Sequence, residues 1–463
     1  MRTTPALLAV AVAVAAAAAS PRPAAAAPLT LDEALALAAR QNGDLAVARA
    51  TRDSASVDAY GSWSGVLPRL DLSGSFGQQW VARQDAVYTV PTFDGTGALT
   101  GFAQQAVTIP ATHYGSNQMG LTLRWTIFDG LSSWRAIAAA RSAARAADRS
   151  LDEAGLQVSF LVTSRFYEVV KQERILKVRE ESAARSDALV RTADALYAAG
   201  RGTRADTFAA RVNLGNDRIA VEAQRAQLVR ARSDLAVALG RETDPELEVV
   251  APAGISGAGL PGLAEPPPME VLMARARQSR PLLAARQGSI EAAEAQAAQA
   301  RGAWWPVLGV LGSYSRQSAD LGGSRGVFGD LSYQYVALAQ VTLTWNLFQG
   351  RQTLAAEQRA DIQAWRARVD AAQADQLVSS EIARARSAVI SLARSAALAQ
   401  DALQAAEQGL TLARERLEAG VASQLEVRDA TQKLAEAQLA LTSSLVDHAV
   451  ARADLNRAVG GSL

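Results

Sequence analysis

The sequence predicts a mainly helical fold with a small β part: a tandem-duplicated bundle of long helices that carries two β-hairpins. The first observation is an internal repeat. Leu121–Gly130 matches Val341–Gly350 at five of ten positions, with an offset of 220 residues. The second is helical periodicity without proline over 131–198 and 351–418. At 1.5 Å per residue each of these segments spans roughly 100 Å, so we expect an elongated molecule.

The repeat extends over most of the chain. The 220-residue offset also pairs Gly200 with Gly420. Upstream of the first match the offset becomes 238 and pairs Pro68 with Pro306, so repeat one holds 18 additional residues. We therefore expect repeat one at 27–240 and repeat two at 269–463. The segment 241–268 holds six of the 15 prolines, which is typical of a linker.

The N-terminus has the pattern of a secretory signal peptide. Arg2 precedes an apolar run of 14 residues, Ala6–Ala19, and small residues follow at 24–27. A transmembrane anchor is the alternative, but a helix needs about 20 apolar residues to cross a bilayer. We expect residues 1–26 to be removed on export.

Composition excludes several classes of function. The 47 basic and 46 acidic residues give a net charge of +1, which argues against nucleic-acid binding. Cysteine is absent and only two histidines occur, so thiolate metal sites, disulfides and a lipid on cysteine are excluded. No Walker, G-x-S-x-G or H-E-x-x-H motif appears. We expect no enzyme, no cofactor and no metal site.

The pattern of each repeat predicts four elements in order: a helix, a β-hairpin, a long helix and a second helix. Thr30 and Glu33 form a capping-box pattern at the start of the first helix. The expected elements of repeat one are 31–62, a hairpin at about 68–128, 131–198 and 203–239. Those of repeat two are 269–303, a hairpin at about 306–347, 351–418 and 423–459. Residues 83–115, rich in Gly, Thr and Ala, are expected to form a long external loop of the first hairpin.

The hairpins alternate apolar and polar residues with period two, which is the β pattern. The apolar set is Leu70, Leu72, Leu121, Leu123, Trp125, Ile127, Val341, Leu343, Trp345 and Leu347. No further strands are expected to cover this face, so we expect it to contact lipid as the outside of a barrel does. Four strands cannot close a barrel and open edges are not tolerated in lipid. Several chains must therefore contribute, giving eight strands in a dimer or twelve in a trimer.

Together these features resemble the TolC-type outer-membrane efflux proteins, over residues 28–463. The specific motifs are Pro68 and Pro306 opening strands, the two Trp-x-x-Phe-x-Gly strand ends at 125–130 and 345–350, and the Ala-Gly turns at 199–200 and 419–420. The resemblance implies a homotrimer with a twelve-stranded outer-membrane barrel and a helical tunnel through the periplasm. The absence of cysteine implies the non-lipidated branch. A periplasmic adaptor (membrane fusion) protein and an inner-membrane transporter are the implied partners.

The resemblance also implies two sites on the helices. The implied adaptor-docking tips are Ala199, Gly200, Arg201, Ala419, Gly420 and Val421. The implied acidic ring of the periplasmic entrance is Asp206, Glu426 and Asp429. These glycines also suit helix C-termini and these acids also suit a first helical turn, so both sets have a structural alternative. Leu417 and Ala422 replace the Tyr and Arg that lock the gate in the family.

The sequence thus favours the passive exit duct of a tripartite efflux pump or a type I secretion system. A periplasmic coiled-coil scaffold without a pore is the main alternative, and a secreted enzyme is a weaker one. Alternating hairpins favour the duct over the scaffold, and missing catalytic motifs argue against the enzyme. The exported substrate stays open, since drugs, metals and polypeptides all use such ducts.

Overall fold

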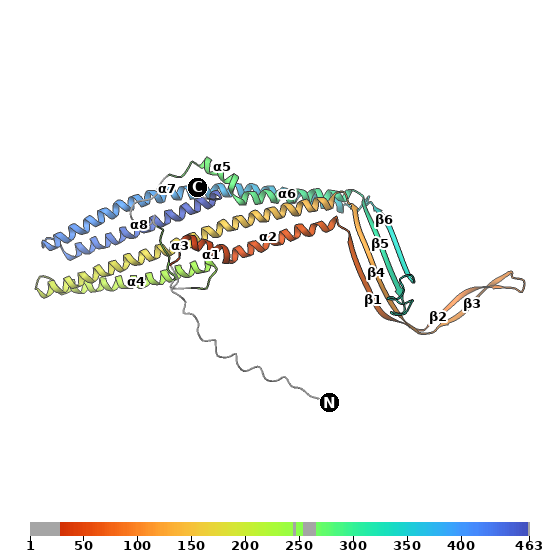
Figure 1. Cartoon of the computed structure of the whole chain (residues 1–463). Helices are drawn as coiled ribbons and strands as arrows, with labels where there is room; N and C mark the ends of the chain where they lie inside the picture. Colours follow the sequence, from red (N-terminus) through yellow and green to blue (C-terminus); the bar gives the residue numbers. More distant parts are fainter. Residues whose placement is uncertain (1–27, 244–246, 253–264, 462–463) are drawn as a thin grey trace, which may run out of the picture. The chain divides into compact units, whose positions relative to one another are not determined.

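A computed structural model describes residues 28–243, 247–252 and 265–461 (Figure 1). The predicted signal peptide, residues 1–26, lies outside the described residues. The chain divides into two compact units. The helical unit comprises the described parts of 1–53, 147–286 and 371–463, and the hairpin unit comprises Ser54–Ala146 and Gln287–Asp370.

The helices reproduce the internal repeat residue for residue. Helices α3 (Ser132–Ala198) and α7 (Gln352–Glu418) both have 67 residues and are offset by 220. Helices α4 (Arg204–Leu239) and α8 (Gln424–Val459) both have 36 residues at the same offset. In the helical unit α4 runs back along α3, and α8 along α7 (Figure 1). The mainly helical fold expected from the periodicity is therefore confirmed.

The first helix of each repeat is broken, which the sequence analysis did not predict. Residues 31–62 form α1 (Leu31–Gln41) and α2 (Gly43–Gly61), which meet at Asn42. Residues 269–303 form α5 (Met269–Ser279) and α6 (Pro281–Arg301), which meet at Arg280. Proline disfavours the helical conformation in the residue before it and suits the first position of a helix, so Pro281 accounts for the second break.

Both breaks lie against the C-terminus of a neighbouring helix. The Asn42 side chain accepts from the Leu45 N–H at 3.1 Å and donates to the Ala238 carbonyl at 2.8 Å. Gly240 and Gly460 end α4 and α8 with φ of +74° and +94°. A Cβ would lie 2.3 Å from the Gln41 carbonyl at Gly240, and 2.8 Å from the Arg280 Cα at Gly460. Backbone approach this close requires glycine at both helix ends.

The helical unit has an apolar core beside each break. In repeat one Val162, Phe166 and Val169 of α3 pack with Leu235 and Leu239 of α4. In repeat two the core is formed by Leu272, Val378, Ile382, Leu455 and Val459.

A buried ionic cluster lies at the second break. The Arg280 side chain is 1% exposed and donates to Glu153 Oε1 at 2.7 Å and Oε2 at 2.9 Å. Arg280 also donates a hydrogen bond to the Glu381 carboxylate at 3.3 Å. Glu381 in turn forms an ion pair with Arg457 at 3.2 Å. Because Glu153 belongs to repeat one and Arg280 to repeat two, this cluster connects the two repeats.

Part of the expected linker is packed against the helical unit. Leu29 forms an isolated parallel bridge with Val249, and its N–H donates to the Glu248 carbonyl at 2.9 Å. Leu247 is buried in the core of repeat one. The described residues 247–251 therefore cover the start of α1.

The hairpin unit holds a four-stranded antiparallel sheet in the order β1-β4-β5-β6. Its strands are β1 (Arg69–Val81), β4 (Thr112–Phe128), β5 (Val307–Ser318) and β6 (Tyr335–Thr344). The two hairpins pair through β4 and β5, starting with Asn117 opposite Ser318. Strand β6 ends at Thr344, three residues before the predicted boundary at 347.

The expected loop at 83–115 is mostly a second hairpin. Strands β2 (Gln84–Phe93) and β3 (Leu99–Ile109) pair as a two-stranded ribbon, and residues 112–115 belong to β4. The ribbon continues the hairpin of β1 and β4 after short breaks at 82–83 and 110–111 (Figure 1). The expectation of a loop is wrong for most of these residues, because they form paired strands with Val, Tyr, Phe and Thr, residue types that favour strands.

The corresponding connection of the second hairpin is short and is organised by a buried arginine. Arg316 of β5 is 1% exposed and donates to the carbonyls of Gly326, Gly329 and Asp330 at 2.7–2.9 Å. Since these acceptors span the connection between β5 and β6, Arg316 fixes how that connection folds.

We predict that Arg280→Met destabilises the protein by about 3–5 kcal/mol, because it leaves Glu153 buried without its partner. The loss should appear as a lower midpoint when helical circular dichroism is followed during denaturation. Adding Glu153→Gln to Arg280→Met should recover part of it, since the uncompensated charge is then gone.

The matched control is Arg277→Met, in the last turn of α5 just before the break at Arg280. Arg277 pairs with Asp375 at 3.0 Å, but the two side chains are 62% and 39% exposed. Exposed pairs contribute at most about 1 kcal/mol. Equal losses for the Arg277 and Arg280 variants would contradict a stabilising role of the buried cluster.

Candidate functional site

The two tip turns, residues 199–203 and 419–423, connect α3 to α4 and α7 to α8. Gly200 and Gly420 have φ of +73° and +74°, which is the left-handed conformation. The Arg201 N–H donates to the Leu196 carbonyl and the Val421 N–H to the Arg416 carbonyl, both at 2.9 Å. These bonds are the pattern that ends a helix with a left-handed glycine.

The tips also expose bare backbone. A Cβ added to Gly200 or Gly420 would meet no atom within 4 Å. Packing within the chain therefore does not require glycine here, whereas backbone conformation does. Ala199, Arg201, Ala419 and Val421 are exposed beside them.

Asp206 lies in the first turn of α4, where it completes the capping box whose N-cap residue is Thr203. Its carboxylate accepts from the Thr203 N–H at 3.1 Å and from the Thr203 hydroxyl at 2.6 Å. The Asp206 N–H donates in return to the Thr203 hydroxyl at 3.2 Å, which completes a capping box. The two bonds from Thr203 hold the pKa of Asp206 below its usual value.

Glu426 and Asp429 are held differently. Glu426 pairs with Arg416 of α7 at 3.2 Å, across the tip turn. Asp429 pairs with Lys433 one turn along α8 at 2.8 Å, and this pair raises the pKa of Lys433. The Ser423 side chain makes no capping bond, so the capping box of α4 has no counterpart in α8. Sequence reasoning missed Arg416 and Lys433 as partners.

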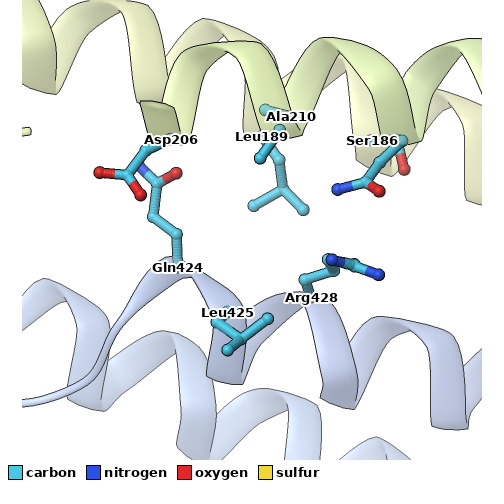
Figure 2. Close-up of a pocket in the computed structure, with 9 residues that line it drawn as sticks. Ser186, Leu189, Asp206, Ala210, Gln424, Leu425 and Arg428 are labelled. Carbon is cyan, nitrogen blue, oxygen red and sulfur yellow. The ribbon is translucent and has the colours of Figure 1, made fainter. Parts of the chain in front are cut away.

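The start of α8 faces α3 and α4 across a cavity of about 220 Å³ (Figure 2). Gln424 reaches from α8 toward Asp206 of α4, and Leu425 and Arg428 of α8 line the same cavity as Leu189 of α3 (Figure 2). A second cavity of about 340 Å³ lies along the same contact. Its lining includes Arg179 and Ser182 of α3 and Gln432 and Leu439 of α8.

We call the contact of α8 with α3 and α4 the in-chain seam. Farther along it, Lys171 of α3 binds Asp447 of α8 at 2.9 Å. The in-chain seam therefore combines apolar side chains, such as Leu189 and Leu425, with polar and charged ones, and it has gaps beside the tips.

The predicted lipid-facing residues of the strands lie on one face of the four-stranded sheet, which we call the leucine face. Leu72 pairs with Leu121, which pairs with Tyr314 of β5. The next rows run from Leu70 to Leu123, and from Trp125 through Val310 to Val341. Exposures on this face reach 73% at Leu72 and 70% at Leu343. In the single chain this face is a broad exposed apolar surface.

The opposite face is polar. Asp71 accepts from Arg69 at 2.8 Å and from Arg124 of the neighbouring strand at 2.9 Å. Thr122 and Thr342 share this face by register. The sheet therefore separates an apolar side from a charged and hydroxyl-bearing side.

Some predicted positions differ from the regular pattern. Ile127 lies at the irregularity between Thr126 and Phe128, and Trp345 and Leu347 follow the end of β6. All three remain exposed. The sequence analysis missed Val310 and Tyr314 on the leucine face, because the intervening glycines of β5 obscure its alternation.

Two features are absent from the described residues. None of the described helices is both long and apolar enough to cross a membrane. No cluster of three or more His, Asp or Glu side chains within the described ranges could hold a metal ion.

Comparison with known proteins identifies the family. The profile of the family described as "Outer membrane efflux protein" matches residues 34–241 and 272–461, which covers both repeats. Outer membrane efflux protein BepC of Brucella suis biovar 1 (strain 1330) is 25% identical over 352 residues, covering 76% of this chain and 74% of BepC.

Solved structures have the same fold. The Campylobacter jejuni CmeC outer membrane channel aligns with a TM-score of 0.76 at 18% identity, over 94% of this chain and 86% of CmeC. The open state of the Neisseria gonorrhoeae MtrE outer membrane channel aligns with a TM-score of 0.73 at 19% identity, over 94% and 89%. The resemblance to the TolC-type proteins is confirmed, and so is the expectation of a channel rather than an enzyme. The chain belongs to the outer membrane efflux protein family and is an outer-membrane efflux channel with a periplasmic helical tunnel.

Proposed function

We propose that three copies of this chain assemble into a channel-tunnel that serves as the passive exit duct of a tripartite efflux pump or a type I secretion system. The observation that supports it best is the exposed leucine face on a sheet whose outer strands, β1 and β6, have free edges. Open edges are not tolerated in lipid, so the sheet must join others.

A trimer satisfies this requirement with twelve strands. The leucine face then contacts lipid, while Asp71, Arg124 and the threonines face an aqueous lumen. A barrel of twelve strands encloses a lumen that side chains do not fill. A barrel of eight strands is filled by its own side chains and has no open lumen. A coiled-coil scaffold, the alternative, offers no use for an apolar sheet face of this size.

The proposed partners follow from the ends of the helical unit. The bare, exposed turns at Gly200 and Gly420 would receive a periplasmic adaptor protein, which would connect the duct to an inner-membrane transporter as the energy source. Because the chain has no cysteine, we also propose that it belongs to the non-lipidated branch of the family.

We propose that Asp206, Glu426 and Asp429 lie at the periplasmic entrance, where three-fold symmetry makes each a ring of three. Rings of carboxylates favour cations. Arg416 and Lys433 stand beside two of these acids and offset their charge. Selectivity then depends on the balance between acids and bases at the entrance.

The proposed function is tested by a neighbouring pair of variants in β1. Leu72→Lys places a charge on the leucine face, where lysine near the bilayer centre costs about 2–4 kcal/mol per copy. Ser73→Lys places the same charge on the polar face. We expect outer-membrane fractions to lose trimers of the Leu72 variant and to retain those of the Ser73 variant. Equal insertion of both, or recovery of the unmodified protein as a soluble monomer, would refute lipid contact.

The docking role of the tips is tested with Gly200→Asn and Gly420→Asn. Asparagine tolerates the left-handed conformation, and open space surrounds both positions. We therefore expect normal trimers but lost export, measured as susceptibility to an exported compound. The control is Gly97→Asn in the β2–β3 connection, which has φ of +83° and the same open space. Loss of trimers in the tip variants would support a folding role only.

The charge balance is tested in planar bilayers under a salt gradient. Glu426→Gln with Asp429→Asn should lower cation selectivity, while Arg416→Gln with Lys433→Gln should raise it. The reversal potential should therefore shift in opposite directions. A reversal potential that stays unchanged in both double variants would leave these groups as local ion pairs without a role in permeation.

A further inference from the structure

The β5–β6 connection, residues 319–334, folds back over the sheet, and the strand register identifies the face that it covers. Positions 115, 117 and 119 of β4 lie at even distances from Leu121, so they share the leucine face with it. Arg316 of β5 lies opposite Met119 and belongs to the same face. Because Arg316 donates to three carbonyls of the connection, it holds the connection against the leucine face, at the end of β5 opposite the one that follows α6.

Further contacts show that the connection crosses the sheet as far as β1. Asn117 of β4 is 5% exposed, and its side chain donates to the Ala319 carbonyl at 2.8 Å. A Cβ at Gly115 would collide with the same carbonyl oxygen, so the backbone of the connection lies directly over β4. Phe328 stacks on Phe76 of β1, with ring centroids 5.7 Å apart. The connection therefore covers this end of the leucine face from β5 to β1.

The free surface of the connection is itself apolar. Leu321, Phe328, Leu331 and Tyr333 are 49%, 62%, 68% and 50% exposed, whereas Val327 is fully buried. The connection thus has an ordered backbone and one buried apolar residue, and it exposes four large apolar or aromatic side chains. An apolar patch of this kind marks a contact surface.

The position of the connection indicates that lipid is the contact. It directly continues the leucine face, which the proposed function places in lipid. At the boundary between them the Tyr314 hydroxyl donates to the Leu331 carbonyl at 3.1 Å, and the Tyr314 ring stacks on Tyr335 at 5.7 Å. Tyrosine, with an apolar ring and a polar tip, is enriched where a membrane meets water.

The chemistry of the connection fits the surface of a bilayer better than its interior. Irregular backbone exposed to lipid is not tolerated in the hydrocarbon core. The connection also carries charged residues, among them Asp320 and Arg325. An apolar surface that alternates with charges and turns suits the boundary between acyl chains and headgroups.

We propose that the β5–β6 connection is an interfacial anchor, which rests in the outer leaflet of the membrane with Leu321, Phe328 and Leu331 among the headgroups and upper acyl chains. Arg316 is the positioning residue, because its carbonyl bonds keep the connection on the lipid side of the barrel wall and away from the pore mouth. This inference rests on the lipid contact of the proposed function and adds the level at which that contact ends. The β2–β3 ribbon then lies outside the membrane.

The test is the accessibility of spin labels in a chain that has no native cysteine. Leu331→Cys and Leu321→Cys each receive a nitroxide, and the labelled trimers are reconstituted in vesicles of phosphatidylcholine and phosphatidylglycerol. Collisions with oxygen, which concentrates in lipid, are compared with collisions with a water-soluble nickel chelate. Leu72→Cys on the leucine face is the lipid control, and Gln104→Cys in the β2–β3 ribbon is the water control. We expect oxygen-to-nickel ratios at 321 and 331 several-fold above that at 104 and below that at 72.

The positioning role is tested in the same assay. Arg316→Gln in the Leu331→Cys background should lower the ratio toward that of the Gln104 label, whereas Arg316→Gln in the Leu72→Cys background should leave the ratio unchanged. Asn117→Ala removes the bond to Ala319 and is the second variant, in case the Arg316 variant does not assemble. A Leu331 ratio that neither substitution changes would contradict the positioning role.

The controls separate failure of this inference from failure of the proposed function. Ratios at 321 and 331 equal to that at 104, with the Leu72 label in lipid, would place the connection in water and overturn the anchor alone. Few collisions with either reagent would mean that protein, such as a neighbouring copy, covers the connection, and this result would also overturn the anchor. A Leu72 label that reports water would overturn the lipid contact of the proposed function and the anchor with it.

Discussion

The helical unit depends on one constraint: shorter helices must meet end to end to cover the 67-residue helix α3. Neither α1 nor α4 is long enough to cover α3 alone, so α3 must be covered by shorter helices that end against one another. Each helix end leaves backbone groups without intrahelical partners. Asn42 and Arg280 supply side chains to those groups, while Gly240 and Gly460 allow the backbones to approach. The two apolar cores lie beside these junctions.

The two junctions have diverged in a way that distinguishes the repeats. In repeat one the bridging group is a neutral amide, and its neighbours are aliphatic. In repeat two it is a guanidinium held by Glu153 and Glu381. A buried guanidinium in place of a neutral amide needs carboxylate partners with correct geometry. Without them, the free-energy cost of desolvating the charge exceeds the electrostatic attraction that it gains. Since one partner comes from α3, the charged junction also fixes how the two repeats of one chain align.

Helix lengths could be predicted because apolar periodicity without proline continues over 67 residues. The helix breaks were missed for different reasons. Asn42 is one polar residue in an amphipathic pattern, and only its tertiary contact with Ala238 shows its role. Pro281 is a visible sequence signal for the second break, which the predicted helix 269–303 does not include. The β2–β3 ribbon was missed because its glycine and proline content is typical of loops, whereas cross-strand pairing decides its conformation.

The candidate sites were predictable where local chemistry determines them. The tip glycines follow from helix termination, and the leucine face follows from period-two alternation in β1, β4 and β6. Strand β5 hides Val310 and Tyr314 among glycines, so only the register with β4 places them. Arg416 could not be found as the partner of Glu426, because the geometry of the intervening turn decides which base reaches the acid.

Duplication followed by divergence explains why the two sides of each helical pair differ. The in-chain seam carries Arg428 and Gln432 and contains cavities, while the corresponding side of α4 carries Phe208 and Val212. A contact within one chain is maintained by covalent connection and tolerates polar groups and water. A contact between chains must supply its own association free energy, and apolar burial provides about 25 cal/mol per Å². Phe208 and Val212 of α4, which are 52% and 63% exposed, are side chains of the kind that a contact between copies of the proposed trimer needs.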